Sequence, residues 1–112
     1  MEDRINQIVA KLRDHDVEKI VLFGSAARGQ SDDKSDVDLL IIKRTRKRFL
    51  DRLKEVMRIL RPDYSLDVLV YTPSELRKML KEENPFIQQV MRDGIVLYEK
   101  PPSRGKALAG PG

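Results

Sequence analysis

The sequence contains no cysteine and a single histidine, His15, among its 112 residues. Without cysteine, the chain has no disulfide, no thiolate metal site and no cysteine nucleophile. One histidine cannot by itself form a histidine metal cage or a histidine-based catalytic triad. Any metal ion held by this chain must therefore be bound through oxygen atoms.

Long hydrophobic runs are also missing. No uninterrupted apolar stretch exceeds four residues, as at 39–42 and 68–71, whereas a membrane-spanning helix needs about 18. The first residues, Met1-Glu2-Asp3-Arg4, lack the basic start and apolar run of an export signal. We therefore expect no membrane association and a cytoplasmic protein.

The length fits one domain with a modest core of two packed layers. The net charge of +4 is uneven, because residues 43–61 hold nine basic and two acidic side chains, which leaves −3 for the rest. Such a segment attracts nucleoside triphosphates, nucleic acid or an acidic partner surface. A solvated helix face explains it equally well, so the charge alone identifies no ligand.

The spacing of apolar residues predicts one domain over residues 1–98, followed by a disordered tail over 99–112. Thr72, Pro73 and Glu75 have the pattern of a capping box, and Gly94 is placed to end the last helix. The expected order is helix 1–14, strand 18–23, strand 37–42, helix 45–60, strand 66–71, a helix from Pro73, a helix from Pro85 and strand 95–98. This order predicts an α/β (α+β) fold, with a sheet covered by helices on one side.

Gly24 and Ser25 follow the first predicted strand, and Asp36 and Asp38 flank the start of the second. Gly24 allows close approach of a phosphate, the Ser25 hydroxyl can donate to it, and the amides of the next turn favour negative charge. The two-residue period of a strand places Asp36 and Asp38 on one face. Adjacent carboxylates suit Mg²⁺, which prefers oxygen ligands.

Each of these features has an ordinary explanation when taken alone. Gly-Ser is common in turns, and an Asp-x-Asp pair is usually a solvated loop feature. Asp67 is harder to dismiss, because a carboxylate in an apolar run must be paired, metal-bound or at the sheet edge. Arg28 could contact phosphate or form a salt bridge with Asp32 or Asp33. The combined pattern of Gly-Ser, ten residues and Asp-x-Asp arises by chance about once in a hundred thousand start positions.

Three segments together resemble a known family. They are Phe23-Gly24-Ser25-Ala26-Ala27-Arg28-Gly29, then Ser35-Asp36-Val37-Asp38-Leu39-Leu40, and the strand region from Asp67 to Leu76. The combination resembles the signature of the minimal nucleotidyltransferases of the DNA polymerase beta superfamily, over about residues 1–98. The resemblance implies a nucleotidyltransferase fold with a small mixed sheet flanked by helices.

The resemblance also implies roles for individual residues. Gly24 and Ser25 would lie at the triphosphate with Arg28 as a further phosphate contact, and Asp36 and Asp38 would bind two Mg²⁺ ions. Asp67 would complete one metal site and help to remove the proton of the acceptor hydroxyl. All three expected carboxylates are present, so an active enzyme is expected.

Minimal members of this family are often antitoxins paired with a helical HEPN toxin. The resemblance therefore implies transfer of AMP from ATP to a tyrosine of such a partner. An alternative is a binding-only antitoxin that neutralises its partner by occlusion. Nucleic-acid binding through residues 43–61 is less favoured, because Phe49 is the only aromatic residue there and its spacing is that of a core position.

Overall fold

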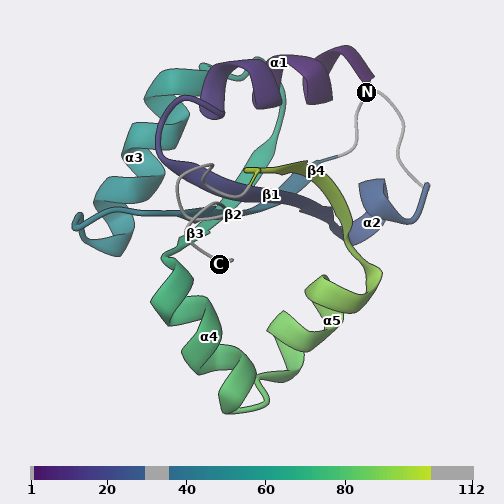
Figure 1. Cartoon of the computed structure of the whole chain (residues 1–112). Coiled ribbons are helices and arrows are strands. Elements are labelled where there is room, and N and C mark those ends of the chain that lie inside the picture. The colour runs from purple at the N-terminus through teal and green to yellow at the C-terminus, as the bar shows by residue number, and fades with distance from the viewer. Residues whose placement is uncertain (1, 30–35, 102–112) are drawn as a thin grey trace.

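The computed structural model describes residues 2–29 and 36–101, and the expected loop 30–35 and most of the expected tail, 102–112, lie outside them. The expected elements are all present, and a short helix follows the first strand (Figure 1). The helices are α1 (Glu2–Leu12), α2 (Gly24–Ala27), α3 (Phe49–Leu60), α4 (Pro73–Lys81) and α5 (Pro85–Asp93). The strands are β1 (Val17–Phe23), β2 (Val37–Lys43), β3 (Leu66–Tyr71) and β4 (Ile95–Glu99).

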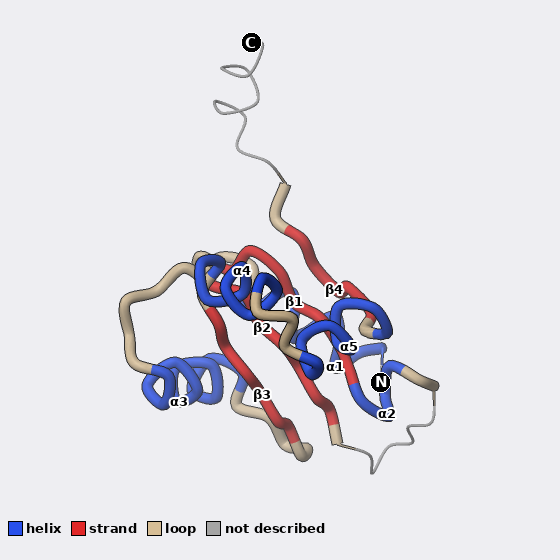
Figure 2. The backbone as a smooth tube through the Cα atoms, turned by 90° about the horizontal axis from the view of Figure 1, so that it is seen from below, coloured by secondary structure: helices blue, strands red, loops and turns tan. Residues whose placement is uncertain are grey.

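The four strands form one mixed sheet in the order β3-β2-β1-β4 (Figure 2). Strand β1 runs antiparallel to both β2 and β4, whereas β2 and β3 are parallel. The end of β1 therefore meets the beginnings of β2 and β3 at the same end of the sheet. The register places Phe23 beside Asp38, and Asp38 beside Asp67.

Helices cover both faces of the sheet, so the expectation of one covered side was wrong. In Figure 1, α1 and α3 lie above the sheet, and α4 and α5 lie below it. Val37, Leu39 and Ile41 face the first helix pair, whereas Leu40 and Ile42 face the second. All five are at most 3% exposed, and a strand buried on both faces is a continuous apolar run rather than an alternating one.

The helix boundaries follow local chemistry. Helix α3 begins at Phe49 rather than at residue 45, because the Lys47 amide donates to Thr45 Oγ1 at 3.1 Å in a preceding turn. The predicted capping box of α4 is confirmed: the Glu75 amide donates to Thr72 Oγ1, and the Thr72 amide donates to Glu75 Oε1. Within the described ranges, no helix is both long and apolar enough to span a bilayer.

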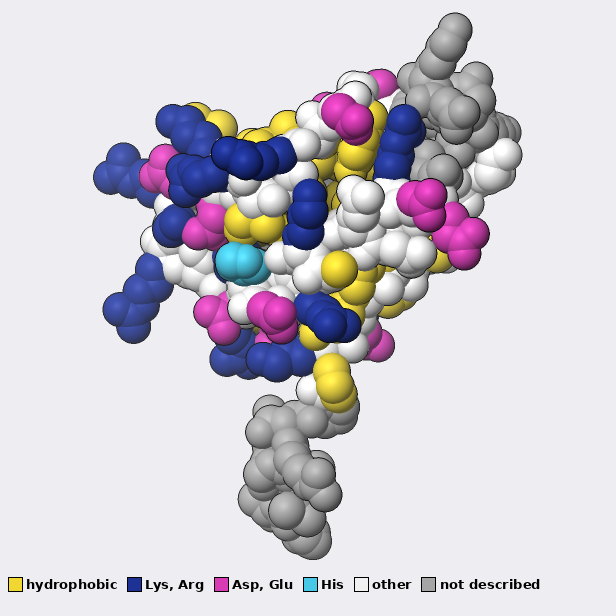
Figure 3. Space-filling model, turned by 90° about the horizontal axis from the view of Figure 1, so that it is seen from above, with side chains coloured by type: hydrophobic (Ala, Val, Ile, Leu, Met, Phe, Trp, Pro, Cys, Tyr) yellow, Lys and Arg dark blue, Asp and Glu magenta, His cyan; other side chains and the backbone are white. Residues whose placement is uncertain are grey.

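The basic segment 43–61 is partly neutralised inside the fold. Four of its nine cations form salt bridges, namely Lys43 and Lys47 with Glu55, Arg44 with Glu18, and Arg52 with Glu75. The remaining ones are exposed, and basic side chains gather over the α3 end of the upper face (Figure 3). The positive patch is thus weaker than the formal charge of the segment suggests.

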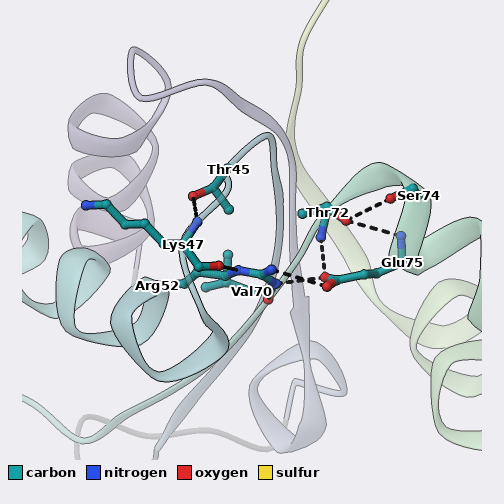
Figure 4. Close-up of polar contacts among 7 residues, drawn as sticks. All are labelled: Thr45, Lys47, Arg52, Val70, Thr72, Ser74 and Glu75. Atoms are coloured by element: carbon teal, nitrogen blue, oxygen red, sulfur yellow. Dashed lines mark hydrogen bonds and ion pairs between the residues drawn. The ribbon is translucent and has the colours of Figure 1, made fainter.

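Arg52 is an exception to the expectation that basic side chains of this helix are exposed, because it is only 7% exposed. Its guanidinium donates to the backbone oxygens of Lys47 and Val70 and pairs with both carboxylate oxygens of Glu75, at 2.7 and 3.2 Å (Figure 4). One side chain of α3 therefore joins β3 to the first turn of α4. Arg52 is the principal cause that holds the pKa of Glu75 below its usual range.

We predict that Glu75→Gln lowers the free energy of unfolding by about 1–2 kcal/mol near neutral pH, because the buried Arg52 loses its charged partner. The lowered pKa means that this contribution is present above pH 4.5, the ordinary value, and is lost as the pH falls through the folded-state value. Urea unfolding from pH 3 to 7 measures the difference. Glu82→Gln, at the exposed end of the same helix, is the control; an equal effect of both changes would contradict the role of the Arg52 pair.

Candidate functional site

Gly24, Asp38 and Asp67 meet where β1 ends and where β2 and β3 begin. Asp38 points to the same face of β2 as Leu40 and Ile42, and Asp67 to the same face of β3 as Leu69 and Tyr71. Both carboxylates therefore lie on the sheet face that α4 and α5 cover further along. The single strand face expected for Asp36 and Asp38 stays a prediction, because Asp36 lies before the first residue of β2, Val37.

Gly24 packs directly against Asp38. Its φ of +75° lies in the left-handed region, and a Cβ at this position would overlap Asp38 Oδ2 and lie 3.2 Å from Asp38 Cγ. Gly29 has a similar φ of +73°, but a Cβ there would meet nothing within 4 Å. Gly24 is thus required by its backbone conformation and also by the close approach of a carboxylate.

Ser25 lies in the short helix α2, and Arg28 is the residue that directly follows this helix. Ser25 is half-buried, and Phe23, the residue before the helix, provides no side-chain cap for the first amides. The Arg28 side chain is exposed, and its backbone amide donates to the carbonyl oxygens of Gly24 and Ser25. Asp32 and Asp33, the alternative partners considered for Arg28, lie outside the described residues.

The carboxylates repel one another. Burial raises the pKa of Asp38, and the neighbouring Asp67 and then Asp36 raise it further. Asp36 and Asp67 are both exposed. Asp67 lies on the edge strand β3, which explains how a carboxylate stands in an apolar run, and it forms no salt bridge with any described side chain.

The carboxylates do not converge on a single point. Over residues 2–29 and 36–101, no group of three His, Cys, Asp or Glu side chains is arranged to hold one metal ion. Asp38 and Asp67 are nevertheless neighbours, and the negative charge of Asp67 helps to raise the pKa of Asp38. Oxygen donors with uncompensated negative charge suit a hard divalent cation such as Mg²⁺.

A cavity of about 110 Å³ lies on the other side of Gly24 from the carboxylates, between α2 and α5. It was not predicted from the sequence. Its lining residues are Phe23, Gly24, Ala27, Arg28, Phe86, Gln89, Val90, Asp93 and Gly94. Four of them are spaced i, i+3, i+4 and i+7 along α5. This spacing was the sequence pattern that could have indicated the cavity, although it usually indicates core packing.

The chain is similar to several known proteins in sequence and in fold. Residues 6–103 match the family model described as "Polymerase beta, Nucleotidyltransferase". Two proteins of Methanocaldococcus jannaschii are named as proposed protein adenylyltransferases. One is 36% identical over 83 residues, 70% of this chain and 77% of its own length. The other is 35% identical over 91 residues, 76% of this chain, which spans only 60% of that relative's length.

A similar fold occurs in a crystal structure described as a toxin-antitoxin with AMP-PNP. It aligns with a TM-score of 0.61 and 25% identity, over 86% of this chain and 73% of the other. The aligned part includes most of the described residues. The mixed sheet flanked by helices that was expected for this chain is thereby confirmed.

We predict that Gly24→Ala destabilises the protein more than Gly29→Ala does. The two changes share the strain of a left-handed backbone, about 1–2 kcal/mol, but only the first forces a methyl group against Asp38. The additional loss should be about 1–3 kcal/mol. Thermal and urea unfolding of both variants measure it, and Gly24→Ala combined with Asp38→Ala should recover most of the extra loss. No recovery would show that Asp38 is not the group that Gly24 accommodates.

A second prediction concerns Asp38→Asn in metal-free protein. The raised pKa of Asp38 means that its charged form weakens folding at neutral pH and that the penalty disappears as the pH falls through the folded-state value. The variant should therefore melt at a higher temperature than wild type at pH 7 in EDTA, and the difference should shrink towards pH 4. Melting curves across this range provide the test. A variant less stable than wild type at pH 7 would contradict this prediction. It would mean that attractive contacts of the Asp38 carboxylate outweigh its repulsion by the neighbouring carboxylates.

Proposed function

Because this chain belongs to the polymerase beta nucleotidyltransferase family, we propose that it transfers a nucleoside monophosphate from a nucleoside triphosphate to a hydroxyl acceptor. The observation that carries this proposal is the adjacency of Asp38 and Asp67 beside Gly24. A pair of carboxylates next to a backbone that phosphate can approach closely provides both halves of a nucleotidyl-transfer site. The relatives' names, which propose protein adenylyltransferase activity for those proteins, point the same way.

In the proposed reaction, the acceptor oxygen attacks the α-phosphorus and forms a new phosphorus–oxygen bond. The bond from the α-phosphorus to the bridging oxygen breaks, and pyrophosphate leaves with the electron pair. Asp67 is exposed on the sheet edge and would accept the proton of the hydroxyl. Gly24 and Ser25 would hold the leaving phosphates through backbone amides and the hydroxyl, with Arg28 as an additional cation.

Asp36, Asp38 and Asp67 are the residues that would hold divalent cations, most simply Mg²⁺. Such ions neutralise the triphosphate and lower the proton affinity of the attacking oxygen. The repulsion that raises the pKa of Asp38 supports this assignment, because a bound cation would relieve it. The family that the sequence resembles implies ATP as the donor and two Mg²⁺ ions, and we propose both for this chain.

We further propose that the acceptor is a tyrosine hydroxyl of a helical HEPN-type toxin, which makes this chain an antitoxin. Support comes from the structural neighbour described as a toxin-antitoxin with AMP-PNP. Asp67 faces solvent at the sheet edge, so the tyrosine of a second protein can reach it. The basic segment 43–61 is less suited to bind the acceptor beside the carboxylates, because α3 packs on the face of the sheet opposite to Asp38.

Asp67→Asn is expected to abolish transfer while ATP binding and stability remain. The side chain is exposed and repels Asp38, so its neutralisation should leave the melting temperature unchanged or higher. The chain is co-purified with its partner, incubated with ATP and Mg²⁺, and the partner's intact mass is measured. Wild type should add one AMP to the partner, and the variant should add none.

Asp51→Asn, on the exposed side of α3, is the control and should transfer AMP normally. Wild-type transfer by the Asp67 variant would remove this residue from the mechanism. A partner that stays unmodified by wild type yet remains tightly bound and inactive would replace the catalytic proposal with neutralisation by occlusion.

A further inference from the structure

The cavity between α2 and α5 continues directly from the proposed phosphate cradle. Gly24 and Arg28, which we propose as triphosphate contacts, form part of its wall. Helix α5 lies beneath the sheet near α2, as the two perpendicular views show (Figures 1 and 2). A ligand bound through its phosphates at Gly24 therefore has this cavity within reach of its remaining part.

The inner walls of the cavity are apolar and aromatic. The Phe86 ring packs edge-on against Phe23, with centroids 5.5 Å apart and planes at 83°, and the residue remains 41% exposed. Ala27 and Val90 complete the apolar lining. An exposed aromatic ring held in place by a second ring offers a stacking surface for a flat ligand.

The back of the cavity is fixed by Gly94. A Cβ at this position would lie 2.5 Å from both Val21 Cγ1 and the Val90 carbonyl oxygen. The absence of a side chain allows the end of α5 to pack tightly against β1. The cavity is therefore formed by a close helix–strand contact of the fold.

Two polar side chains, Gln89 and Asp93, lie on the same lining. They follow Phe86 at i+3 and i+7, so α5 presents the ring and both polar groups on one face. The Gln89 amide offers a donor and an acceptor, which is the pattern that glutamine uses to bind the N6–N7 edge of adenine. The carboxylate of Asp93 can accept from an amino group but repels a carbonyl oxygen.

We propose that this cavity is the nucleobase subsite and that it binds adenine, with Phe86 stacking on the ring and Gln89 recognising its edge. This inference rests on the proposed nucleotidyl transfer and adds the residues that select the nucleotide. The volume of about 110 Å³ is a fraction of the roughly 300–1,000 Å³ of pockets that enclose whole drug-sized ligands. The cavity thus accommodates one ring system, while the ribose and phosphates remain outside along Gly24.

The order of the groups along the sheet indicates which part of the ligand lies at the cavity. Asp67 on β3, Asp38 on β2 and Gly24 after β1 follow one another, and the cavity lies beyond Gly24 next to the start of β4. In-line attack requires the acceptor and the leaving pyrophosphate on opposite sides of the phosphorus. The nucleoside is joined to the α-phosphorus through its 5′ oxygen and projects to the side of this line. The acceptor approaches at Asp67, so the cavity beyond Gly24 lies away from the acceptor tyrosine and is left for the nucleoside.

Titration of the 112-residue chain with ATP, GTP, UTP and inorganic tripolyphosphate, each with Mg²⁺, tests the subsite. Wild type should bind ATP more tightly than GTP or UTP. Phe86→Ala should weaken ATP binding by about tenfold or more, as expected when a base loses an aromatic stacking partner, and leave tripolyphosphate binding unchanged. Gln89→Ala should reduce the preference for ATP over GTP.

Gln88→Ala and Leu80→Ala are matched controls, because both side chains are exposed and neither lines the cavity. They should bind every ligand as wild type does. Unchanged ATP affinity in Phe86→Ala, or an equal loss for tripolyphosphate, would overturn the base subsite even if ATP binds and is used. Failure of wild type to bind either ATP or tripolyphosphate would instead overturn the proposed function.

Discussion

The adjacency of Asp38 and Asp67 on two parallel strands is the constraint that the rest of the structure has to satisfy. Like charges placed side by side on neighbouring strands repel each other, and the raised pKa of Asp38 reflects this repulsion together with burial. The pairing persists because β2 and β3 are aligned over six residue pairs and β2 is buried on both faces. The carboxylates stand at the open end of this register, where water reaches them and weakens their repulsion.

The far end of β3 is held by Arg52. An edge strand with few partners can slip in register, and a slip of one residue would turn Asp67 to the opposite face. Arg52 reaches from α3 to the Val70 carbonyl oxygen and to Glu75 in the first turn of α4, so both flanking helices hold the strand. Glu75 simultaneously completes the capping box with Thr72, which means that one carboxylate links a helix start to the position of a strand.

Local patterns in the sequence predicted the elements and singled out the candidate site residues. The period of the apolar residues located the helices and strands, whereas the structure was needed to place Asp38 and Asp67 on one face of the sheet. Coverage of both faces was missed, although Leu39–Ile42 is the kind of continuous apolar run that two-sided burial produces. The burial of Arg52 and the close contact of Gly94 with Val21 could not be predicted, because both depend on partners distant in sequence.

The two sides of Gly24 differ in how completely this chain builds them. On the α5 side, aromatic, apolar and polar side chains line the cavity that we propose as the nucleobase subsite. On the Asp67 side, the sheet ends at the edge strand β3, and the carboxylate faces solvent. Nucleotide selection can therefore reside within the chain. In the proposed reaction the acceptor would supply much of its own alignment, because a folded protein that docks against the sheet edge can hold a hydroxyl rigidly at Asp67.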